Sequence, residues 1–110
     1  MRKLILSILL ITAATPAFAS PIGTWRVADG TANVLIRRCG RNLCGSTGGK
    51  VVFKGMRPTA KNLWAGVIFD ARSGDQYDGQ ISLINQDALK VHGCLPGGGM
   101  CGDQTWTRVR

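Results

Sequence analysis

The sequence predicts an all-β protein, a small antiparallel meander barrel of about eight strands. Short runs of alternating apolar and polar residues recur at spacings of about ten residues, which is typical of small barrels and sandwiches. The chain contains 15 glycines, which favour turns. All 6 of its acidic residues are aspartates, so it lacks glutamate, a good helix former.

The first four expected strands alternate clearly. Trp25 and Val27 share one face of the first, and Val34 and Ile36 point inward in the second. The third is short and ends at a pair of glycines, and the fourth carries Phe53 in an apolar stretch. These four strands are expected at residues 21–27, 32–38, 43–47 and 50–56.

A polar turn is expected at residues 57–62, because the residue before a proline is pushed out of helical geometry. The fifth strand is apolar on both sides, and Gly66 in its middle marks a bend or bulge. In the sixth strand Tyr77 and Ile81 share the apolar face. The last four strands are expected at residues 63–70, 76–84, 88–94 and 104–110.

The turns between these runs are too short for anything but antiparallel neighbours. An exposed sheet edge promotes aggregation, and closing an eight-stranded meander into a barrel removes it. The interior of such a barrel holds packed side chains or one small ligand. A small open sandwich is the alternative architecture.

The amino terminus predicts a cleaved secretory signal peptide at residues 1–19, followed by one domain at 20–110. Met1-Arg2-Lys3 is a positive start, residues 4–14 are mostly apolar, and Ala17-Phe18-Ala19 is a cleavage signal. The apolar run is too short for a membrane anchor, which needs about 20 residues. We therefore expect a periplasmic or secreted protein that does not span a membrane.

Four cysteines in an exported chain are expected to be oxidised. Three pairings are open to four cysteines. We favour Cys39 with Cys44 and Cys94 with Cys101, because each pair flanks a loop of hairpin length. Metal is not expected at these cysteines, since zinc sites need thiolates and usually closer spacing.

A series of short motifs resembles the bacterial family called domain of unknown function 2147. The motifs are Trp25, Asp29-Gly30, Val34-Leu35-Ile36, Cys39-Gly40, Leu43-Cys44-Gly45, Trp64-Ala65-Gly66, Ile68-Phe69-Asp70, Ser73-Gly74, Tyr77, Leu89-Lys90-Val91, Gly93-Cys94 and, most specifically, Gln104-Thr105-Trp106-Thr107-Arg108.

The resemblance implies an exported, lipocalin-like or calycin-like β-barrel of the cell envelope, with no established activity. Family members usually carry a longer insert where this chain has only residues 46–56, which implies a barer barrel mouth or a smaller cavity. The sequence is also similar to lipocalins in pairing Trp25 of the first strand with Arg108 of the last. We expect these two residues to form a cation–π plug at the barrel bottom, and Trp106 to lie in the core.

The candidate ligand-binding residues are apolar or basic. Trp64, Ile68 and Tyr77, with Phe69 and Val91, line a ligand cavity or simply fill a small core. The basic residues Arg38, Arg41 and Lys54 would steer an anionic group at the barrel mouth, or form a solvated face. These two interpretations stay open for each set.

Catalysis has little support in the sequence. His92 is the one histidine, and no nucleophile is evident at its strand partners, so we expect a satisfied surface or rim histidine. No cofactor is implied, and nucleic acid does not suit an exported protein despite the formal charge of +8.

The expected function is therefore the binding or carriage of a small, partly apolar ligand, with or without an anionic group, in the cell envelope. The alternative is a protein-interaction module, an inhibitor or assembly factor, that acts through basic outer loops around a filled core. Its partner would be an envelope protein or an anionic envelope surface.

Overall fold

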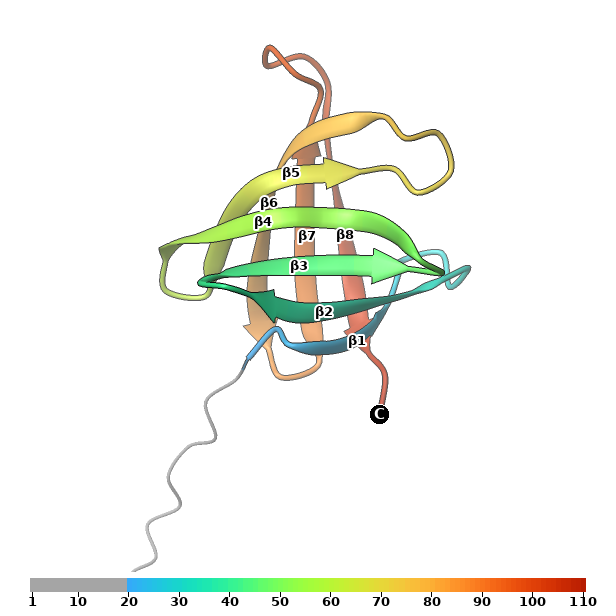
Figure 1. The fold of residues 1–110 in the computed structure, drawn as a ribbon, viewed down its shortest axis with the longest axis vertical. Coiled ribbons are helices and arrows are strands. Elements are labelled where there is room, and N and C mark those ends of the chain that lie inside the picture. Colours follow the sequence, from blue (N-terminus) through green and yellow to red (C-terminus); the bar gives the residue numbers. More distant parts are fainter. Residues whose placement is uncertain (1–19) are drawn as a thin grey trace, which may run out of the picture.

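The computed structural model describes residues 20–110, and the predicted leader lies outside the described residues. Each strand pairs antiparallel with the next, and β8 pairs with β1, so the sheet closes into a barrel (Figure 1). This confirms the predicted all-β meander. The strands are β1 (Gly23–Arg26), β2 (Asn33–Cys39), β3 (Asn42–Thr47), β4 (Lys50–Ala60), β5 (Leu63–Phe69), β6 (Gln76–Asn85), β7 (Ala88–Cys94) and β8 (Cys101–Arg108).

Most predicted strand ends differ from the structure by at most two residues, but two of them are wrong by more. β4 continues to Ala60, because Pro58 pairs with Trp64 and only residues 61–62 are left for the turn. The sheet tolerates this proline because a register irregularity follows it. β8 begins at Cys101 rather than Gln104, since Cys101 faces Cys94 and extends the β7–β8 ladder to the disulfide.

A bulge at Val52 helps to bend β4 around the barrel. Phe53 pairs with Gly45 and Val51 with Ser46, so Val52 is an extra residue and both Val52 and Phe53 are buried. A Cβ on Gly45 would lie 2.7 Å from the Phe53 ring, which explains why a glycine faces it.

The bend predicted at Gly66 lies instead in the neighbouring strand. Gly55 of β4 has φ 64°, and the β4–β5 register shifts between Lys54 and Arg57. Gly66 provides room for this bulge, because a Cβ on it would lie 2.8 Å from the Met56 sulfur.

The up-and-down order gives the barrel two different ends. The open end carries the β1–β2, β3–β4, β5–β6 and β7–β8 connections, and the closed end carries the other three hairpins and both ends of the described chain. The disulfide Cys39–Cys44 lies at the closed end and Cys94–Cys101 at the open end. Both predicted pairings are confirmed.

Arg108 closes the barrel at the closed end. Its guanidinium lies 4.4 Å from the centroid of the Trp25 ring, so the expected cation–π contact is present. The same group donates hydrogen bonds to the carbonyls of Ile22 and Ser20, while the Trp25 indole N–H donates to the Pro21 carbonyl at 2.8 Å. Among residues 20–110 no helix is long and apolar enough to cross a membrane.

Candidate functional site

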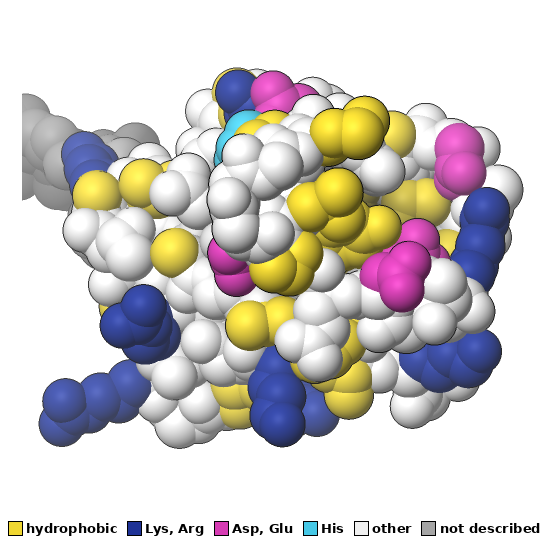
Figure 2. All heavy atoms as spheres, turned by 90° about the horizontal axis from the view of Figure 1, so that it is seen from above, with side chains coloured by type: hydrophobic (Ala, Val, Ile, Leu, Met, Phe, Trp, Pro, Cys, Tyr) yellow, Lys and Arg dark blue, Asp and Glu magenta, His cyan; other side chains and the backbone are white. Residues whose placement is uncertain are grey.

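A cavity of about 600 Å³ opens among the loops of the open end. Its wall is mostly apolar and comes from the inward faces of the strands, where alternation places every second side chain inside. Figure 2 shows apolar side chains exposed side by side, with aspartates next to them. The main apolar wall residues are Val34, Val52, Ile68, Phe69, Tyr77, Val91 and Trp106.

The floor of the cavity is Trp106. Its ring stacks on Phe53 with centroids 5.5 Å apart, and Phe53 is fully buried and does not border the cavity. Beyond Phe53 the closed half is packed with Ile36, Met56 and other fully buried side chains. The interior is therefore filled in one half and open in the other.

Three charged side chains and one threonine border the opening, and we call them the rim: Asp29, Thr31, Asp70 and Arg72. The rim carries two aspartates and one arginine, so its formal charge is negative although the whole protein is basic. Lys50 adds one positive charge beside it, where its Nζ lies 3.4 Å from the Ala71 carbonyl.

The rim aspartates already have partners. The Thr31 hydroxyl donates to Asp29 at 2.6 Å and its backbone N–H donates at 3.0 Å, and these bonds, with the charge of Arg72, lower the pKa of Asp29 below 3.8. Asp70 accepts the backbone N–H of Arg72 at 2.8 Å, which shapes the β5–β6 loop. These bonds fix the conformation of the rim, and those to Asp29 favour the ionised form of its carboxyl group.

The structure brings only part of the predicted apolar wall to this cavity. Ile68 and Tyr77 border it, together with Phe69 and Val91. Trp64 does not: it is partly buried and packs against the core, where it pairs with Pro58 of β4 and Ile81 of β6. Trp106 is buried as expected, but it also forms the floor.

The predicted basic mouth is not where the cavity opens. Arg38 lies near the end of β2 and Arg41 in the β2–β3 turn, both at the closed end, and Lys54 is exposed in the middle of β4. None of them borders the cavity. The placement at the mouth is thus corrected: in a meander, alternate hairpins lie at opposite ends, and the one beside Cys39 lies away from the opening.

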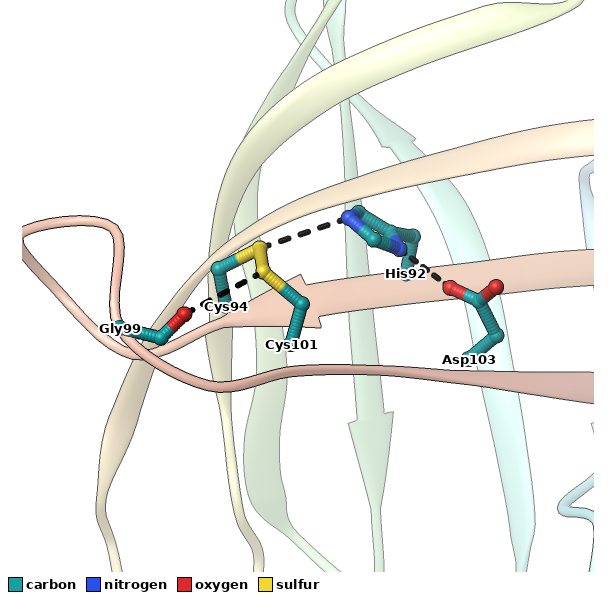
Figure 3. Close-up of a disulfide and its surroundings, with 5 residues drawn as sticks. All are labelled: His92, Cys94, Gly99, Cys101 and Asp103. Atoms are coloured by element: carbon teal, nitrogen blue, oxygen red, sulfur yellow. Dashed lines mark hydrogen bonds and ion pairs between the residues drawn. A yellow bond between two sulfur atoms is a disulfide. The ribbon is translucent and has the colours of Figure 1, made fainter.

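A cluster at the open end was missed by the sequence reasoning. His92 faces Asp103 across β7 and β8, and its Nδ1 is hydrogen-bonded to the Asp103 carboxylate, while its Nε2 lies 3.4 Å from Cys94 Sγ (Figure 3). The signal was present, since pairing Cys94 with Cys101 sets the register that puts His92 opposite Asp103.

Fold and site together define a small, disulfide-linked, closed antiparallel barrel with one packed end and one open cavity. The chain belongs to the family described as uncharacterized proteins conserved in bacteria, DUF2147, whose model matches residues 46–108. That segment includes the Cys94–Cys101 hairpin and begins after the Cys39–Cys44 hairpin. No curated protein and no solved structure matches the chain.

Proposed function

We propose that this barrel binds a small molecule with an apolar body in the cavity at its open end. The observation that carries the proposal is the half-filled interior: a cavity of about 600 Å³ above the Trp106 floor. Ligand sites are usually about 300–1,000 Å³ and largely apolar, with a few polar groups that orient the ligand.

The charges of the rim favour some polar head groups of the ligand over others. Asp29 is ionised beside the opening, while Arg38, Arg41 and Lys54 lie elsewhere. Negative charge at a mouth attracts cations and repels anions. An uncharged or cationic head group therefore suits this opening better than the anionic one expected from the sequence.

Binding is tested with three fluorescent alkyl probes of equal chain length that end in a carboxylate, a hydroxyl or an ammonium group. We expect the ammonium and hydroxyl probes to bind more tightly than the carboxylate. Tyr77→Ala should weaken binding roughly tenfold, because losing a buried aromatic contact costs about 1.4 kcal/mol. Trp64→Ala is the matched control, since Trp64 lies outside the cavity.

The head-group preference has its own pair of variants. Asp29→Asn keeps the acceptor for Thr31 and removes the charge, so it should reduce the preference for ammonium about twofold to fivefold. Asp78→Asn removes an equal charge on the outside of β6 and should leave the preference unchanged. Absence of binding by all three probes, or equal effects of Tyr77→Ala and Trp64→Ala, would contradict the proposal.

A second candidate function rests on the basic residues of the closed end. Within residues 20–110, Arg38, Arg41 and Lys61 are exposed and form no ion pair. They suit an acidic protein partner, whose binding would weaken with salt. Arg38→Ala with Arg41→Ala would abolish retention of such a partner on a column of immobilised protein, whereas Tyr77→Ala would not.

The compartment is part of the proposal. Two disulfides and the sequence of the leader support an oxidising location such as the periplasm, where cystines persist.

A further inference from the structure

The outer face of the β7–β8 hairpin carries a disulfide, an imidazole and a carboxylate in a row. Cys94 faces Cys101, and two residues along each strand His92 faces Asp103. Because side chains two residues apart point to the same face of a strand, all four lie on the same side of the hairpin (Figure 3). We call these four residues the His92–disulfide cluster.

The hydrogen bonds of the cluster orient the imidazole toward sulfur. The bond from His92 lowers the pKa of Asp103 below 3.8, and Lys90 Nζ lies 3.6 Å from the other carboxylate oxygen. An ionised carboxylate can only accept, so His92 donates through Nδ1–H. Its Nε2 is then directed at Cys94 Sγ, 3.4 Å away.

The two sulfurs are not equivalent. Cys101 is exposed, whereas Cys94 is half-buried and lies beside His92. An incoming thiolate therefore has open access to Cys101, and the sulfur that it displaces is Cys94. A neighbouring imidazolium stabilises a thiolate and so makes it a better leaving group.

We propose that Cys94–Cys101 is a thiol–disulfide exchange site that reacts with dithiols. A dithiol's thiolate forms a bond to Cys101 Sγ, the Cys94–Cys101 bond breaks, and the electron pair remains on Cys94, which takes the Nε2 proton of the His92 imidazolium. The second thiol of the reductant then displaces Cys101 from the mixed disulfide and passes its proton to the Cys101 sulfur. His92 regains a proton from the solvent, which received one when the first thiolate formed. Two electrons and two protons pass to the protein, which ends with two thiols while the reductant becomes a disulfide.

The backbone hydrogen bonds of the β7–β8 hairpin hold its geometry when the disulfide is broken. The β7–β8 ladder runs from Ala88 with Thr107 to the cystine itself, and the loop beyond is held by Leu95 N–H donating to the Met100 carbonyl at 2.8 Å. Breaking the sulfur bond therefore leaves the two thiols facing each other. The reaction can then run in reverse and close the cystine again.

The other disulfide provides an internal comparison. In the described part of the chain no side chain is hydrogen-bonded to the sulfurs of Cys39 or Cys44, and the one histidine is at position 92. Arg38 precedes Cys39 and Arg41 lies in the loop between the two cysteines, so positive charge is present there. An arginine does not give up its proton, so it cannot protonate a leaving thiolate.

The test is reduction of the native, oxidised protein by limiting dithiothreitol, followed by acid quenching, alkylation and mass spectrometry of each cystine. We expect Cys94–Cys101 to be reduced roughly tenfold faster than Cys39–Cys44. His92→Gln should slow its reduction severalfold and leave Cys39–Cys44 unchanged. Lys90→Gln, which removes a charge from the same face without a contact to sulfur, should change the rate by less than about twofold.

A second measurement distinguishes an effect of His92 on thiol reactivity from an effect of loosening the hairpin. After full reduction under native conditions, Cys94 should react with maleimide faster than Cys39, and His92→Gln should remove that advantage, because the thiolate loses its partner. A variant that merely loosens the hairpin would speed alkylation instead. Equal reduction rates for the two cystines, or no effect of His92→Gln in either assay, would overturn the proposal.

Discussion

Arg108 joins three parts of the closed end through one side chain. It stacks on Trp25, donates to the Ile22 carbonyl at 3.0 Å, and also donates to the carbonyls of Ser20 and Gln86. The planar guanidinium makes this combination possible, since it stacks through its face while its N–H groups donate in the plane.

Arg108→Ala should lower the free energy of unfolding by about 2–3 kcal/mol, because charge-assisted hydrogen bonds and a cation–π contact are lost together. The free energy of unfolding of Arg108→Lys should lie between those of the wild type and Arg108→Ala, since lysine keeps the positive charge but lacks the planar set of N–H donors. Urea unfolding measures the change. Arg37→Ala is the control, since Arg37 is exposed on β2 and its loss should cost less than about 0.5 kcal/mol. Equal losses in the two variants would contradict the role of Arg108.

At the residue scale, the Trp25–Arg108 contact was expected from the similarity to lipocalins, and the structure contains it. It forms because the first and last strands of the closed meander are neighbours. The cluster at His92 was missed although the predicted Cys94–Cys101 pair fixes the β7–β8 register, and a shift by one residue would have turned the His92 side chain to the other face.

At the scale of elements, β5 and β6 determine the shape of the cavity wall. Gly79 of β6 lies under Ile68 of β5, and a Cβ on Gly79 would lie 2.1 Å from Ile68 Cδ1. The absence of a side chain at Gly79 therefore keeps Ile68 against the sheet and the cavity open beside it.

Gly79→Ala should push Ile68 into the cavity and lower the free energy of unfolding by about 1–3 kcal/mol. Combining it with Ile68→Ala should cost less than the sum of the two single changes, because the clashing atoms are gone. Gly102→Ala is the control, because a Cβ there meets nothing within 4 Å. Thermal or urea unfolding measures these free energies. If the effects of Gly79→Ala and Ile68→Ala are strictly additive, the proposed clash between the two residues is wrong.

β4 shows the limit of reasoning from alternation within an element. Its bulges place the consecutive residues Val52 and Phe53 inside, while Val51 is exposed. A strict period of two cannot predict this, because the bulge changes the phase, and its position depends on Gly45 and Gly66 in the neighbouring strands.

For the molecule as a whole, the seam between β1 and β8 is the shortest junction of the barrel. Only Trp25 with Arg108 and Arg26 with Thr107 face each other there, whereas β5 and β6 pair along the whole of β5. A short ladder has few bonds to break, so local opening should begin at this seam.

Hydrogen exchange followed by mass spectrometry should find the amides of β1 less protected than those of β6. Arg108→Ala should lower the protection of β1 further and leave that of β6 nearly unchanged under conditions where the protein stays folded, because the loss is local to the seam. If β6 exchanges before β1, the barrel opens elsewhere and this view of the seam is wrong.

The sequence by itself determined the strand periodicity, the antiparallel order and the cysteine pairs, because alternation, turn residues and short loops are local properties of the chain. Only the tertiary structure decided which end is open, that Trp64 lies off the cavity, and that Arg38 and Arg41 lie at the far end. These facts depend on bulges and register, which arise when distant strands pack and are not encoded in any single stretch.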